Sequence, residues 1–190
     1  MNEISYYEEF ADKFITYIQT YLGKDYIIHY SINKTLDTII DDLRELTGKQ
    51  IISENIYIPK LKIDIVFAIH RKNEPVKLIL VEAKYLNQLR LIDYSQLVGY
   101  LQVGKIIDLG LLLLIQKEYS TNKLSNAFQE IIRLKKLPME WVVQLKPSSE
   151  KHQFQTGILY YVPNNGIDWI NTSELNGISS FEELIVALKK

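Results

Sequence analysis

Two carboxylates and a lysine lie within consecutive apolar segments of the sequence. Asp64 interrupts the apolar run of residues 63–66, and Glu82 and Lys84 end the apolar run that follows Lys77. Runs of Ile, Val and Leu of this length are typical of strands that are buried on both faces. A charge in such a strand is costly unless it is paired or bound to a metal. These three side chains are therefore candidates for chemistry.

The spacing of the three residues predicts that they share one face of a sheet. Side chains alternate across a strand, so Glu82 and Lys84 point the same way. Residues 70–75 are polar and contain a proline, which predicts a hairpin between the two strands. Pairing of these strands would place Asp64 beside Glu82, with Lys84 one step along the same face.

The predicted pair of carboxylates, Asp64 and Glu82, suits a divalent cation. Two adjacent carboxylates repel each other unless a proton or a cation lies between them. Hard oxygen ligands favour Mg²⁺, which also keeps waters for chemistry. Lys84 would then orient or deprotonate an attacking water, or stabilise charge on a phosphate. The alternative is a solvated strand-end ion pair, because about one Glu-x-Lys is expected by chance at ordinary Glu and Lys frequencies.

Gln96 and Tyr100 form a second pattern just downstream. Both lie in residues 92–103, which are predicted to be helical, and residues four apart share a helix face. The alternative reading of this pair is a surface glutamine and a half-buried tyrosine.

The order of these residues resembles the PD-(D/E)xK nuclease superfamily, in the branch that adds a Gln-x-x-x-Tyr motif. The segment from Val81 to Tyr100 looks especially like the nuclease domains of type I restriction motor subunits and RecB-like nucleases. The resemblance covers about residues 36–115, and Ile63 stands where the name-giving proline would be. It implies an α/β fold, with a restriction endonuclease-like αβββαβ core whose mixed central sheet is flanked by helices, followed by C-terminal strands and a helix.

The resemblance also implies an activity, that of a Mg²⁺-dependent endodeoxyribonuclease in which Mn²⁺ would substitute. Asp64 and Glu82 would hold the metal, and the carbonyl of Ala83 would be a further ligand. Lys84 would be the catalytic base or an electrostatic stabiliser. The glutamine and tyrosine of the helix motif would lie beside the active site and position nucleic acid or the catalytic residues.

Many members of this superfamily add a helix acid to the site, and the sequence does not identify it. The candidates are Glu8, Glu9, Asp41, Asp42 and Glu45. None is preferred, because most acids on amphipathic helices are merely solvated. The three histidines, His29, His70 and His152, are far apart in the sequence and are expected at the surface or core edge rather than as ligands.

The remaining elements are predicted from apolar periodicity and from helix and turn signals. Helices are expected at residues 5–22, 35–46, 92–103, 124–136 and 180–190, and strands at 26–32, 62–69, 77–84, 109–115, 141–145, 157–162 and 167–170. Residues 50–58 look extended and would complete the three strands of the core. Ser180 and Glu183 form a capping box for the last helix. We expect one domain over residues 1–190, with its core at about 35–116, an N-terminal helix at 5–22 and a C-terminal α/β extension at 121–190.

Composition and charge limit the functional classes. The net charge is −1, whereas DNA-binding surfaces are usually basic, so positive charge must be concentrated locally or supplied by another subunit. No apolar run is long enough to span a membrane, the first residues lack the features of a signal peptide, and there is no cysteine. These features indicate a cytoplasmic protein without a membrane partner.

Three functional classes stay open. The first is an independent endonuclease that acts on DNA in a restriction, mobile-element, viral or repair setting. The second is a cleavage subunit with a separate recognition or motor subunit, and the third is an inactive DNA-binding or assembly module. A two-fold homodimer is the smallest arrangement that places one site on each DNA strand. The residues considered for its interface, with burial in the monomer core as the alternative, are Tyr160, Tyr161, Trp169 and Ile170.

Overall fold

The structure is a computed structural model, and it describes residues 3–52, 56–134, 140–144, 151–170 and 177–189; residues 3, 140–144, 151 and 152 are described by their backbone alone. The helices are η1 (Glu3–Tyr6), α1 (Tyr7–Leu22), α2 (Leu36–Thr47), α3 (Leu91–Gly104), α4 (Asn126–Arg133) and α5 (Phe181–Leu188). The strands are β1 (Ile27–Thr35), β2 (Lys62–His70), β3 (Lys77–Tyr85), β4 (Leu109–Ile115), β5 (Glu140–Gln144), β6 (Lys151–Val162) and β7 (Gly166–Trp169).

The strands form one mixed sheet of seven strands in the order β1-β2-β3-β4-β6-β5, with β7 pairing to β6. β2 is antiparallel to both of its neighbours, β1 and β3, whereas β3, β4 and β6 run parallel to one another. Every residue of β4 is buried, because a central parallel strand is covered on both faces. The sheet therefore joins the expected core to the C-terminal extension, and the predicted mixed α/β fold with flanking helices is confirmed.

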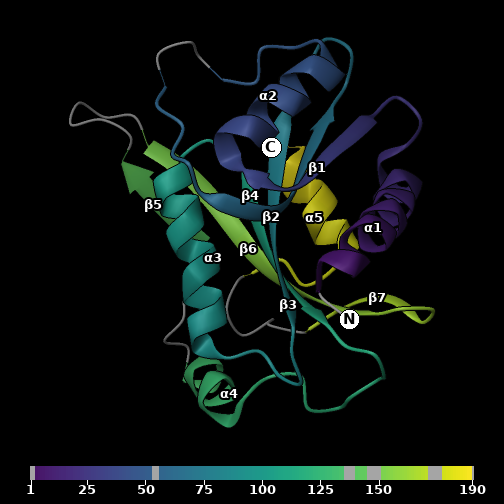
Figure 1. Ribbon diagram of the computed structural model, residues 1–190, viewed down its shortest axis with the longest axis vertical. Coiled ribbons are helices and arrows are strands. Elements are labelled where there is room, and N and C mark those ends of the chain that lie inside the picture. Colours follow the sequence, from purple (N-terminus) through teal and green to yellow (C-terminus); the bar gives the residue numbers. More distant parts are fainter. Residues whose placement is uncertain (1–2, 53–55, 135–139, 145–150, 171–176, 190) are drawn as a thin grey trace.

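Two apolar cores lie on opposite faces of this sheet. α2 and α3 cover one face, and α1 and α5 cover the other (Figure 1). Residues alternate between the two cores along each strand: Val66 and Leu80 face α2 and α3, whereas Phe67 and Val81 face α1 and α5. The even-numbered positions of β3 and positions 66 and 68 of β2 therefore belong to the face that α2 and α3 cover. Ile63 also packs in that core, so the alternation of β2 is broken between Ile63 and Ile65.

The order of elements differs from the expected one in its first strand. The described part of residues 50–58 contains no strand, and the antiparallel partner of β2 is β1, which precedes α2. The register runs from Ile27 opposite His70 to Thr35 opposite Lys62, so β1 occupies the whole length of this edge of β2. The expected order of one helix and three consecutive strands from residue 35 is therefore wrong: α2 lies between β1 and β2, and in the described part of the chain only β2 and β3 follow it before α3.

The helix ends agree with the predicted bounds except in α4 and α5. α4 begins only at Asn126, because the Ser125 hydroxyl accepts a hydrogen bond from the Phe128 backbone N–H and caps the helix. Residues 135 and 136 of the predicted helix lie outside the described residues. At α5, Ser180 Oγ accepts from the Glu183 N–H at 3.1 Å, but the Glu183 carboxylate accepts from Ser179. Half of the predicted capping box is therefore formed.

Three of the four residues that were considered for a dimer interface are buried in the monomer core. Tyr160, Tyr161 and Ile170 are 2%, 0% and 8% exposed. Trp169 packs its ring edge against Phe181 at 5.4 Å between centroids. The alternative of burial in the monomer core therefore holds for Tyr160, Tyr161 and Ile170, whereas Trp169 is partly buried.

Candidate active site

β3 places Glu82 in the interior of the sheet and Lys84 near its end. Glu82 is 2% exposed, and it follows Leu80 on the face that α2 and α3 cover. Lys84 is two residues further along the same face, and its Nζ lies 2.6 Å from Glu82 Oε1. Only 17% of the Lys84 side chain is exposed, so the ion pair is largely shielded from solvent. The predicted alternation along this strand accounts for the pairing.

Asp64 joins the pair from the neighbouring strand. The β2–β3 ladder is regular up to Ile65 opposite Val81, and Asp64 occupies the next position. There its Oδ2 accepts a hydrogen bond from the Ala83 backbone N–H at 2.9 Å. The carboxylate thus bonds to the backbone of β3 between Glu82 and Lys84. The predicted convergence of these three residues is present.

Burial and the neighbouring carboxylate disfavour the charged form of Glu82. Burial is the larger effect, and together with the charge of Asp64 and a carboxyl–carboxyl hydrogen bond with Asp64 it raises the pKa of Glu82 to about 7. Lys84 acts in the opposite direction through its hydrogen bond and its charge. Below about pH 7 Glu82 is therefore mostly protonated, and a cation between the two carboxylates would replace this proton.

The donor set fits a hard divalent cation with an open coordination sphere. Among the described residues, no group of three or more His, Asp and Glu side chains comes together. Two carboxylates, Asp64 and Glu82, are nevertheless the kind of protein ligand set that Mg²⁺ uses, because this ion keeps several waters. Such an ion would offset the burial and the repulsion from Asp64 that disfavour the charged form of Glu82. The Ala83 carbonyl stays a predicted ligand.

The helix acids have other partners or other positions. Glu9 pairs with Lys13 at 2.9 Å on α1, which covers the opposite face of the sheet from Glu82. Asp42 accepts hydrogen bonds from Ser31 and Lys34, and Asp41 pairs with Arg44. Glu8 and Glu45 line a surface hollow beside Asp42. Within the described residues, none of the five joins Asp64 and Glu82.

Gln96 and Tyr100 lie on α3, which packs on the same face of the sheet as Glu82. As expected from their spacing, they share a helix face, and Gln96 Nε2 donates to Tyr100 Oη at 2.7 Å. Gln96 is exposed, and Tyr100 packs in part against the core. The helix is fixed at its start, where the Arg90 N–H donates to the Asp93 carboxylate at 2.8 Å.

Two of the histidines are neighbours, although the sequence indicated that they are isolated. The β1–β2 register places His29 diagonally across from His70, and their rings stack at 6.2 Å between centroids. His70 Nδ1 contacts the Arg71 carbonyl at 3.1 Å. Burial, followed by the charge of His70, lowers the pKa of His29. Among the described residues, neither histidine belongs to a group of three or more potential metal ligands. That the histidines are not ligands stays a prediction.

Gln116 is a buried polar residue beside this site that the sequence analysis did not identify. It is 8% exposed and follows the end of β4, the neighbour of β3. The sequence did contain a pattern that could have indicated this residue: Gln116 directly follows the carboxyl end of the predicted strand at residues 109–115. Such ends commonly carry ligand-binding groups in α/β sheets.

Comparison of the chain with protein-family models, with curated proteins and with solved structures gave no match. Within the described residues, the helices are all too short or too polar to cross a membrane.

Proposed function

We propose that this chain is a Mg²⁺-dependent endodeoxyribonuclease that hydrolyses phosphodiester bonds in DNA. The observation that carries the proposal is the buried Glu82 carboxyl, which has Asp64 on one side and the Lys84 amine 2.6 Å away on the other. A carboxyl whose pKa is shifted by burial and by a specific charged neighbour is a candidate for a functional site. The resemblance of the surrounding motif to PD-(D/E)xK nucleases supplies the reaction class.

Each residue then has a separate task. Asp64 and Glu82 would hold the metal, and the bond from Asp64 to the Ala83 N–H keeps the first carboxylate at a fixed place on β3. Mg²⁺ bound there would polarise the phosphate ester and neutralise the charge that develops during hydrolysis. Lys84 Nζ would orient the attacking water or take up its proton, and its low exposure keeps solvent away from it.

Gln96 and Tyr100 would position the substrate from α3. The Gln96 amide donates to the Tyr100 oxygen, which leaves the Tyr100 hydroxyl hydrogen available for an acceptor such as a phosphate oxygen. The half-buried position of Tyr100 restricts the directions in which this hydroxyl can point. The pair therefore acts as a single hydrogen-bonding unit on the exposed side of the helix.

A second candidate is a cleavage subunit whose grip on DNA comes from another protein. The observation in its favour is the net charge of −1, because affinity for DNA is dominated by contacts of lysine and arginine with phosphates. The two candidates differ in whether the purified chain cuts DNA alone or only after a partner has been added.

A cleavage assay with supercoiled, linear duplex, single-stranded and branched DNA tests the proposal. We expect cleavage in Mg²⁺ or Mn²⁺ and none in EDTA, while Ca²⁺ supports binding without cleavage. Lys84→Met should lower the rate by at least about 100-fold, because a positioned acid–base or electrostatic group contributes about 10²–10⁴-fold. Glu130→Gln, an exposed change on α4, is the matched control and should cut like the parent. Cleavage by Lys84→Met at the parental rate would refute the assignment of this site.

A further inference from the structure

A hollow opens where β3 and β4 end, one residue beyond Lys84. Its volume is about 450 Å³, and it is lined by residues 85–87 and 116–120, which follow the two strands. Tyr85 and Ile115 are register partners in parallel strands, so this β3–β4 hollow lies at the carboxyl ends of neighbouring parallel strands. Ligands of α/β sheets commonly bind at this edge, in pockets of about 300–1,000 Å³.

Gln116 gives the β3–β4 hollow a hydrogen-bond acceptor of fixed orientation. Its Nε2 donates to the carbonyl oxygens of Leu86, at 3.3 Å, and of Asn87. Because carbonyl oxygens only accept, the amide nitrogen must face them and the amide oxygen must face away. Among the described residues, Gln116 Oε1 has no hydrogen-bond partner. A buried acceptor without a partner is costly, so this position favours a ligand that brings an N–H donor.

Two tyrosines give the same hollow its aromatic surfaces. Tyr85 stacks on Tyr6 with 5.6 Å between ring centroids. Tyr119 is 62% exposed, although its ring is held by an edge contact with Tyr160 at 5.8 Å and by the Lys123 amine 5.0 Å away. An exposed aromatic ring that is already held in place loses little freedom when a flat ligand stacks on it. Tyr119 is therefore suited to stacking.

We propose that the β3–β4 hollow receives one unpaired nucleobase of the DNA strand that is cut beside Lys84. This inference rests on the proposed nuclease function. Tyr119 stacks on the base, Gln116 Oε1 accepts from an amino or imino N–H of the base, and the Lys117 ammonium at the rim faces the phosphates. A flat ring with N–H groups at its edge, attached to a phosphate chain, matches an aromatic, an amide and a cation in one hollow.

The proposal specifies a substrate class. In a duplex the pairing edge of a base is engaged by its partner, and the base faces are covered by stacking, so the ring cannot lie against Tyr119. A base can therefore enter the hollow only from single-stranded DNA, a flap, a frayed end, or a duplex from which it has been flipped at additional cost. We expect this chain to prefer DNA with an unpaired nucleotide next to the cut phosphate over an intact duplex.

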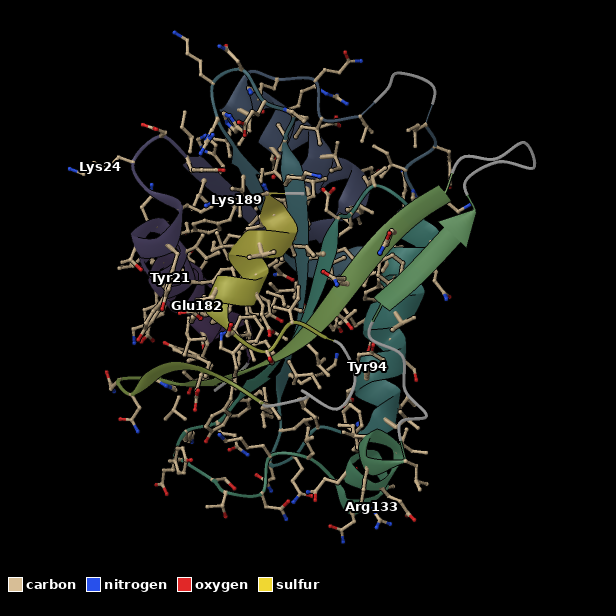
Figure 2. The ribbon with its side chains drawn as sticks, turned by 180° about the vertical axis from the view of Figure 1, so that it is seen from behind. Tyr21, Lys24, Tyr94, Arg133, Glu182 and Lys189 are labelled. Atoms are coloured by element: carbon tan, nitrogen blue, oxygen red, sulfur yellow. The ribbon has the colours of Figure 1, made fainter. Side chains whose placement is uncertain are left out.

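Binding of a short fluorescent single-stranded oligonucleotide and of its duplex, measured by anisotropy in Ca²⁺, provides the first test. We expect tighter binding of the single strand by the parent chain. Tyr119→Ala should weaken single-strand binding by about five- to 150-fold, the usual range for the loss of one base–aromatic stack. Tyr21→Ala is the matched control, because Tyr21 is also partly exposed but lies on α1 beside Glu182 of α5 (Figure 2). It should bind like the parent.

An abasic nucleotide scanned along the oligonucleotide separates stacking from a merely structural role of Tyr119. At the position that enters the hollow, loss of the base should reduce parental affinity at least to that of Tyr119→Ala, and Tyr119→Ala should respond less than the parent, because only its contact with Gln116 is left to lose. An equal response of both proteins, or parental affinity in Tyr119→Ala, would overturn the proposal. Cleavage without preference for unpaired DNA would overturn it while leaving the nuclease function intact. Base-dependent binding without any cleavage by the purified chain would support the hollow and refute an independent nuclease.

Discussion

Replacement of Glu82 by glutamine should make the metal-free protein more stable at alkaline pH. The folded state raises the pKa of Glu82 from 4.5 to about 7, mainly through burial and then through Asp64. The folded state therefore binds a proton more tightly than the unfolded state does, so the free energy of unfolding falls as pH rises between 4.5 and 7. A difference of this size corresponds to about 3 kcal/mol at pH 8. Solvent screens this carboxyl little, because Glu82 is 2% exposed.

Urea unfolding in EDTA at pH 4.5 and at pH 8 measures this effect. Relative to the parent, Glu82→Gln should gain about 3 kcal/mol on going from the lower to the higher pH, because glutamine keeps the shape of the side chain without its charge. Glu130→Gln, on the exposed side of α4, should follow the parent at both pH values. Parallel pH profiles for the parent and Glu82→Gln would refute the reasoning that Glu82 is destabilised by its surroundings.

Addition of Mg²⁺ extends the same experiment to the metal. An ion that binds only the folded parent stabilises it by about 2.7 kcal/mol at a concentration one hundred times its Kd. The gain should appear at pH 8 in the parent and be greatly reduced in Glu82→Gln, since one of the two predicted ligands has lost its charge.

Two further predictions concern single side chains at and away from the site. Asp64→Ala and Asp64→Asn should both abolish cleavage. The free energy of unfolding of Asp64→Ala should be about 1–3 kcal/mol lower than that of Asp64→Asn, because only alanine leaves the Ala83 N–H without an acceptor. Equal free energies of unfolding in urea for the two variants would contradict this role of Asp64. Gly157→Ala should cost about 1–3 kcal/mol, since a Cβ there would lie 2.7 Å from the Ile178 backbone oxygen. Gly99→Ala, within α3, should instead stabilise by about 0.5–1 kcal/mol, because a Cβ there meets nothing within 4 Å; thermal unfolding of both variants checks the two signs.

The part of the site that depends on strand alternation was predictable from the sequence. Glu82 and Lys84 fall on one face because a strand repeats every two residues, and the short hairpin between the strands brings Asp64 to the position next to Glu82. The helix pair Gln96 and Tyr100 was predictable for a similar reason, since helix spacing is also a local property. Both patterns required only the correct assignment of nearby elements.

Features that depend on pairing between distant segments were not predictable in the same way. The sequence of residues 26–58 does not indicate whether β1 or the extended segment after α2 pairs with β2. The contact of His29 with His70 exists because β1 is the strand that pairs there. The bond from Asp64 to the Ala83 N–H requires that the regular ladder ends at Ile65. The role inferred for Gln116 likewise depends on the parallel register of β3 and β4.

The packing of α5 against α1 has a consequence for the order in which the chain folds during synthesis. Phe181 of α5 contacts three aromatic residues of α1, namely Phe14, Tyr17 and Tyr21, so helices from distant parts of the chain complete one core. A ribosome that adds about 5–20 residues per second needs roughly 10–30 s between the synthesis of these two helices. During this interval the apolar side of α1 lacks its last covering element. We therefore expect the nascent chain to bind chaperones that recognise exposed aromatic segments until residues 181–188 have emerged.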